Sequence, residues 1–168
     1  MTTPNIFDFA TSELSQDAFV CWLAAWADPG CRGASGPLHA TGTAFVTRLL
    51  EVGGGPKVAE VRSVQVRRQW RDIDVLLVVN GDTAIVIEDK TDTKDHSDQL
   101  RRYRAAVAKE FPADRTAAVY LTIHDNHNYR AVLHAGYGLF VRNDFLSVLD
   151  AGDRAGVQND IYSDFCRQ

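Results

Sequence analysis

The sequence contains little cysteine, no long apolar run and no excess of positive charge, and each feature narrows the class of protein. The three cysteines, Cys21, Cys31 and Cys166, are odd in number and widely spaced. They predict neither a disulfide framework nor a metal knuckle, and they favour a reducing, cytoplasmic compartment. No segment approaches the roughly 18 apolar residues of a membrane-spanning helix. Residues 1–8 lack the basic and apolar regions of a signal peptide, so no membrane contact is expected.

The formal net charge is −4, so the overall charge gives no indication of a nucleic-acid partner. The arginines are nevertheless clustered in two segments of the chain. The clusters are Arg62, Arg67, Arg68 and Arg71 in the first segment, and Arg101, Arg102 and Arg104 in the second. From charge alone, these are either two solvated faces or two local patches that contact phosphate groups.

The chain has 168 residues, 45% of them hydrophobic and 24% charged. These values are ordinary for one globular domain of roughly 100–200 residues. The spacing of apolar residues predicts helices at 12–27, around 45–50, and at 96–110, 144–149 and 157–166. It predicts strands around 64–67 and at 73–79, 84–87 and 116–123. The resulting order predicts a mixed α/β sandwich.

Charged residues stand at the ends of two apolar strands. Asp72 and Asp74 lie at the start of one strand, and Glu88, Asp89 and Lys90 end the next. Glu88 and Lys90 are two residues apart and share a face of the strand, whereas Asp89 points to the other face. Carboxylates on neighbouring strands beside a lysine form a hard-oxygen site suited to Mg²⁺. The competing interpretation is a set of solvated charges at strand ends.

The loop between these two strands decides whether Asp74 and Glu88 can share a metal ion. A two-residue turn at Asn80 and Gly81 would place Asp74 opposite Ile87, with Glu88 on the other face. A three-residue loop sets Asp74 opposite Glu88, with Cβ atoms roughly 5 Å apart. An Asn-Gly pair by default favours the two-residue turn, whereas a metal ion shared by the two carboxylates requires the odd register. We give precedence to the shared metal site and predict an odd-length loop, or a bulge that restores this register.

In their order along the chain, these residues resemble the motif of the PD-(D/E)XK nuclease superfamily. Asp74 is followed by Glu88-Asp89-Lys90, and Gln99 and Tyr103 stand at i and i+4 on the next predicted helix, similar to the QxxxY motif of RecB-like members. The run IEDKTDTKDHSDQLRRY and the segment NIFDFATSELSQDAFVCWLAAW are similar to those of one subfamily. The resemblance implies a restriction-endonuclease-like fold, with a mixed β-sheet core flanked by helices.

The resemblance also implies roles for the site residues. Asp74 and Glu88 are expected to bind the metal, and Lys90 is expected to be the catalytic lysine. Glu13, early in the first helix, is expected to complete the metal or water network; its alternative is an ordinary glutamate in a first helical turn. Asp72 is either a second ligand or a solvated residue at the strand start.

Two further residues follow from the QxxxY resemblance. Gln99 and Tyr103 are expected to orient the substrate or the site. For Tyr103 the alternative is a core position, because an aromatic residue on the apolar face of a helix is usually buried.

The resemblance thus implies a nuclease that hydrolyses phosphodiester bonds with Mg²⁺, for which Mn²⁺ substitutes. The expected partner is nucleic acid, DNA before RNA, contacted by arginines Arg67, Arg68, Arg71, Arg101 and Arg102. The alternative is an inactive module of the same fold that binds nucleic acid or protein. We expect one domain over 1–168, with a helical part at 1–56, a sheet core with the active-site helix at 57–124, and a helical tail at 125–168. Members are commonly longer, which leaves room for a further C-terminal region.

Overall fold

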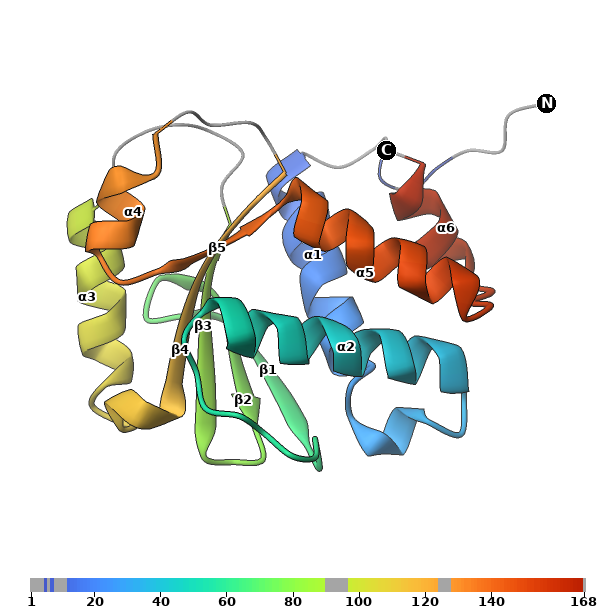
Figure 1. Cartoon of the computed structure of the whole chain (residues 1–168), viewed down its shortest axis with the longest axis horizontal. Helices are drawn as coiled ribbons and strands as arrows, with labels where there is room; N and C mark the ends of the chain where they lie inside the picture. Colours follow the sequence, from blue (N-terminus) through green and yellow to red (C-terminus); the bar gives the residue numbers. More distant parts are fainter. Residues whose placement is uncertain (1–4, 6, 8–11, 90–96, 124–127, 168) are drawn as a thin grey trace.

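The structure, a computed structural model, describes residues 5, 7, 12–89, 97–123 and 128–167, with the backbone alone for residues 12–14 and 97. Within these ranges the chain forms a five-stranded sheet with helices on both faces (Figure 1). The helices are α1 (Ser12–Ala25), η2 (Pro29–Cys31), α2 (Gly36–Val52), α3 (Ser97–Val107), η3 (Ala113–Arg115), α4 (Arg130–His134), α5 (Arg142–Arg154) and α6 (Asp160–Cys166). The strands are β1 (Val64–Trp70), β2 (Ile73–Val79), β3 (Thr83–Asp89), β4 (Thr116–Thr122) and β5 (Gly138–Val141).

The sheet is mixed, with the strand order β1-β2-β3-β4-β5. β1, β2 and β3 are antiparallel neighbours, whereas β4 and β5 continue the sheet in parallel pairs. The α3 helix makes the crossover between β3 and β4, because parallel neighbours need a long connection. This mixed sheet flanked by helices confirms the predicted fold class.

Helices cover both faces of the sheet, which explains the nearly continuous apolar runs of β2 and β3. Val75, Leu77 and Ile87 pack with α1, α2 and α5 on one face, called here the α1 face. Leu76 and Val86 pack with α3 and α4 on the opposite face, called the α3 face. Figure 1 shows α3 and α4 together on one side of the sheet and the other long helices on the opposite side.

The α1 and α2 helices approach each other closely at Gly42. A Cβ atom at this position would lie 2.6 Å from the carbonyl oxygen of Leu23, so only glycine fits without a shift of the backbone. The α2 helix begins where the Ser35 side chain accepts a hydrogen bond from the backbone N–H of Leu38, at 3.3 Å. It ends at Val52, and Gly53 is the C-cap residue.

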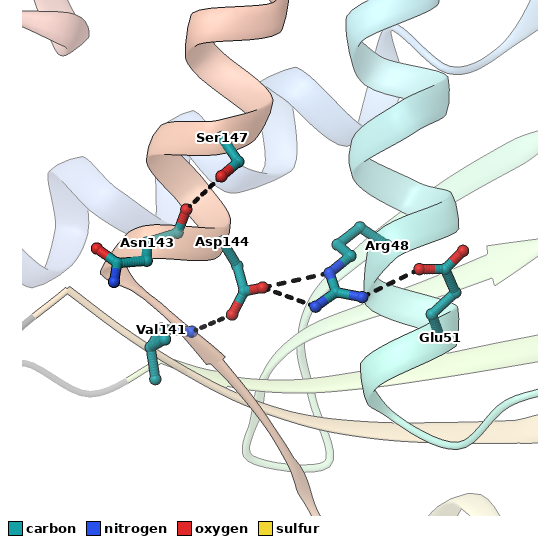
Figure 2. Close-up of polar contacts among 6 residues, drawn as sticks. All are labelled: Arg48, Glu51, Val141, Asn143, Asp144 and Ser147. Carbon is teal, nitrogen blue, oxygen red and sulfur yellow. Dashed lines mark hydrogen bonds and ion pairs between the residues drawn. The ribbon is translucent and has the colours of Figure 1, made fainter.

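A polar contact joins α2 to the start of α5 (Figure 2). The Nε and Nη2 atoms of Arg48 donate to Oδ1 of Asp144 at 3.2 and 2.8 Å. The other oxygen of Asp144 accepts a hydrogen bond from the backbone N–H of Val141 at 3.1 Å, which caps the helix. One carboxylate thus fixes both the first turn of α5 and its position against α2.

Some element boundaries differ from those predicted, and four short elements of the described chain, η2, η3, α4 and β5, were not predicted. β5 has four residues and α4 has five, too few to give a clear periodicity. The α5 helix extends well beyond the predicted 144–149, whereas α6 begins later than residue 157. All three cysteines are free, as expected. None of the helices in the described part of the chain has the length and apolar character needed to cross a bilayer.

The loop between β2 and β3 has three residues, as predicted. Val79 pairs with Thr83, and Val75 pairs with Ile87. Asn80 and Gly81 have positive φ angles of 55° and 77°, and the N–H of Asp82 donates to the carbonyl of Val79 at 3.3 Å. The loop is therefore an Asn-Gly turn with one additional residue, which restores the odd register.

Asn80 joins this loop to the segment that precedes β1. Its Oδ1 atom accepts hydrogen bonds from the backbone N–H groups of Arg62 (2.7 Å) and Ser63 (3.3 Å). Its Nδ2 atom donates to the carbonyl of Glu60 at 2.9 Å. Asparagine also tolerates the positive φ angle better than other residues with a side chain.

We predict that Asn80→Ala lowers the free energy of unfolding by about 2 kcal/mol, since it removes these hydrogen bonds and leaves alanine in a left-handed conformation. Urea denaturation measures the change. Asn143→Ala, at an exposed position of α5, is the control and should change stability by less than about 0.5 kcal/mol. Equal effects of both substitutions would contradict a special role of Asn80.

Candidate active site

Asp74 and Glu88 face each other across β2 and β3. Val75 pairs with Ile87. Continuing this register by one residue along each strand sets Asp74 opposite Glu88. Both side chains then lie on the α3 face, with Cβ atoms roughly 5 Å apart. Two carboxylates at this spacing suit Mg²⁺, which is usually bound by one or two carboxylates together with phosphate oxygens.

Glu88 is fully buried, and the α3 helix supplies a donor for it. The Nε2 atom of Gln99 donates to Oε1 of Glu88 at 3.2 Å. The same amide lies 2.6 Å from the hydroxyl oxygen of Tyr103, which accepts a hydrogen bond from it. Tyr103 is only 7% exposed and belongs to the apolar core on the α3 face. Its ring therefore occupies a core position, while its hydroxyl reaches Gln99.

Asp74 is held by the backbone of the neighbouring strand. Its Oδ2 atom accepts a hydrogen bond from the backbone N–H of Asp89 at 3.4 Å, a long contact. Asp72, in contrast, lies in the turn before β2 with a φ of 67° and is exposed. The prediction that Asp72 lies at the start of the same strand as Asp74 is therefore wrong, because β2 begins only at Ile73.

The side chains of two predicted site residues, Lys90 and Glu13, are not described by the structure. Lys90 lies outside the described residues, and for Glu13 the structure describes the backbone within α1 and not the side chain. Among the described side chains, no group of three or more His, Cys, Asp or Glu is arranged to bind a metal ion. Asp74 and Glu88 therefore contribute two carboxylates, and a third protein ligand would have to come from elsewhere.

Asp89 points to the α1 face, opposite to Glu88, as its position in the strand predicted. It is 1% exposed, and the Nε2 atom of Gln16 in α1 donates to its Oδ1 atom. Burial, then the charge of Asp17 and a hydrogen bond with Asp17, raise the pKa of Asp89 to about 9, while Gln16 lowers it. Asp89 is therefore anchored to the first helix on the side away from Glu88.

The sequence interpretation did not include Gln16, although the sequence carries a signal for it. Gln16 precedes Phe19 by three residues and Leu23 by seven, so it lies on the apolar stripe of α1. A polar side chain on such a stripe is buried with the stripe and needs a partner there. Cys21, in the same helix, is also buried, and burial raises the pKa of its thiol to about 11.

The predicted nucleic-acid arginines lie on different faces. Arg67 and Arg71 both form ion pairs with Glu110, whereas Arg68 lies near the α1 face, where its charge acts on Cys21. Arg101 and Arg102 are exposed on α3, and Arg101 pairs with Asp98 at 3.4 Å.

Arg104 differs from these arginines because its side chain has a structural role. Its Nη1 atom donates to the carbonyls of Ala135 and Gly136, at 3.1 and 3.3 Å. It therefore fixes the end of α4 against α3.

Comparison with protein families agrees with this architecture. The model of the PD-(D/E)XK nuclease superfamily matches residues 4–166, and the chain belongs to this superfamily. No curated protein and no solved structure matches the chain. Membership of the RecB-like QxxxY subfamily stays a prediction.

We predict that Gln16→Ala lowers the free energy of unfolding by about 2–3 kcal/mol, because it opens a cavity and removes the amide donor of buried Asp89. Chemical denaturation measures the loss. Gln65→Ala, at an exposed position of β1, is the control and should be nearly neutral. An unchanged stability of Gln16→Ala would show that the contact with Asp89 does not stabilise the fold.

Proposed function

We propose that this protein is a divalent-metal-dependent nuclease that hydrolyses phosphodiester bonds, with Asp74 and Glu88 as metal ligands. The register of β2 and β3 is the observation that carries the proposal, because it turns both carboxylates toward the same face. Membership of a superfamily of nucleases that generally use divalent ions supports it. Mg²⁺ fits a donor set of carboxylate oxygens, and Mn²⁺ is expected to replace it.

In this proposal the chain's own residues prepare the site. Gln99 orients Glu88, and Tyr103 holds the amide of Gln99 in place. The backbone N–H of Asp89 orients Asp74. Glu13 completes the acidic set, and Lys90 contributes a positive charge beside the attacking water or the phosphate. When bound, the ion would lower the pKa of water and stabilise charge on the phosphate.

We predict that the wild-type protein cleaves single- or double-stranded DNA or RNA with Mg²⁺ or Mn²⁺ and that EDTA stops cleavage. Asp74→Asn should lower the rate by about a hundredfold or more, because it removes a ligand charge while keeping the side-chain shape. Glu88→Gln and Lys90→Ala should act in the same direction. A cleavage assay with each nucleic acid measures the rates.

The chain offers a matched control for this experiment. Asp72→Asn makes the same chemical change two residues earlier, in an exposed turn, and should leave the rate within about twofold. Full activity of Lys90→Ala or Asp74→Asn would overturn the proposed site. A folded protein that binds nucleic acid without cleaving it would instead favour the alternative, an inactive module of the nuclease fold.

We also predict that Arg101 and Arg102 contribute to nucleic-acid binding, with DNA as the expected partner. Both are exposed on the helix that carries Gln99. Replacing both with glutamate should weaken affinity and reduce its salt dependence, because fewer counterions are released on binding. Titrations at several salt concentrations measure this change. The variant should retain the metal affinity of the wild type, and a salt-independent affinity of the wild type would favour a different kind of ligand.

A further inference from the structure

Arg67 and Arg71 share a single carboxylate partner beside the hairpin of β1 and β2. The Nη1 atom of Arg67 lies 3.4 Å from Oε2 of Glu110, and the Nη2 atom of Arg71 lies 3.2 Å from Oε1. The three side chains are 31%, 47% and 37% exposed, respectively. Two cations thus meet one anion at a position that solvent and a large ligand can reach.

This arrangement matches the chemistry of phosphate binding. Each oxygen of the Glu110 carboxylate contacts one guanidinium group. A phosphodiester group presents two anionic oxygens in a similar arrangement. A solvent-exposed ion pair contributes little to stability, so a phosphate can replace the carboxylate at low cost. The cluster also retains one net positive charge, which attracts a second anion.

The turn that presents Arg71 is built from residues that disfavour its conformation. Trp70 pairs with Ile73, so Arg71 and Asp72 form a two-residue loop, with φ angles of 53° and 67°. A loop of this kind favours Asn and Gly. Arginine at this position therefore lowers stability, and such local conflicts between sequence and backbone are found mainly at functional sites.

The Arg71 side chain also contacts the ring of the neighbouring Trp70. The guanidinium carbon lies 4.5 Å from the centre of the Trp70 ring, a cation–π contact. Because this contact ends when Arg71 moves, the fluorescence of Trp70 reports on the position of the arginine.

Arg67 lies on the sheet face that carries the candidate active site. Arg67 pairs with Leu76, which lies on the α3 face together with Asp74. Arg71 is three residues from Asp74 along the chain. We propose that Arg67 and Arg71 form a phosphate-binding pair that Glu110 occupies in free protein, and that the DNA backbone displaces the Glu110 carboxylate. This inference rests on the proposed nuclease function, because it identifies where the substrate backbone binds.

The test is a titration of a short fluorescein-labelled DNA, single-stranded and as a duplex, in EDTA so that cleavage does not interfere. Glu110→Gln should bind about three- to tenfold more tightly than the wild type, since it removes the competing charge. Its affinity should also depend more steeply on salt, because one more phosphate contact releases counterions. The control is Asp82→Asn, which makes the same charge change at a carboxylate paired with Arg115 at the β2–β3 loop. It should leave the affinity unchanged within about twofold.

A second arm separates this competition from a general charge effect. In a protein that also carries Arg67→Ala and Arg71→Ala, Glu110→Gln should no longer tighten binding. Arg71→Gly should weaken DNA binding but raise the thermal midpoint of unfolding, because glycine accepts the positive φ angle. DNA should change the tryptophan fluorescence of the wild type and not that of Trp70→Phe.

The possible results distinguish this inference from the proposed function. If Glu110→Gln binds no more tightly than Asp82→Asn, the inference is overturned even when the protein cleaves DNA normally. If Glu110→Gln binds more tightly and no metal supports cleavage, the inference stands and the nuclease proposal fails. Absence of DNA binding by the wild type overturns the inference as well.

Discussion

The pairing register of β2 and β3 is the constraint on which the candidate site depends. A side chain changes face with each residue of a strand, so a shift of one residue would separate Asp74 from Glu88. The register is fixed by a turn in which Asn80 and Gly81 adopt positive φ angles and Asp82 adds one residue. The geometry of two carboxylates at one end of the sheet is thus determined by a loop at the opposite end of the same strands.

The second constraint on the site is the burial of two consecutive carboxylates, Glu88 and Asp89, at the end of β3. Glu88 and Asp89 point to opposite faces, and each is almost fully buried. Each therefore needs a hydrogen-bond donor from a different helix, and both donors are glutamines, Gln99 from α3 and Gln16 from α1. The two helices thereby hold the end of β3 from both sides. Rigid support of this kind keeps ligand groups in place before a substrate binds.

The sequence predicted this part of the molecule well because its signals are local. Counting residues left a two-residue and a three-residue loop open, and the requirement that Asp74 and Glu88 share a face selected the odd-length loop. The i, i+4 spacing set Gln99 and Tyr103 on one helix face, where their side chains are in contact. The partner of Asp89 did not follow, since Gln16 is distant in sequence and only tertiary packing joins α1 to β3. β5 was missed for a similar reason, because four residues become a strand only when β4 provides an edge for them. The ion pairs of Glu110 with Arg67 and Arg71 were not predicted. Glu110 follows α3, and nothing in the sequence connects that segment with the hairpin of β1 and β2.

The two hairpins of the sheet differ in how well their residues suit the backbone. The β2–β3 turn uses Asn80 and Gly81, which tolerate positive φ angles, and hydrogen bonds of Asn80 stabilise it further. The β1–β2 turn imposes the same kind of conformation on Arg71 and Asp72, where each residue costs about 1 kcal/mol or more. In the β2–β3 turn, which sets the register, the residue types suit the backbone conformation. Sequence and structure disagree beside Asp74, where Arg71 stands at the tip of the hairpin in a conformation that disfavours it. In our proposal this positive side chain binds a phosphate, which accounts for a turn that is less stable than an Asn-Gly turn would be.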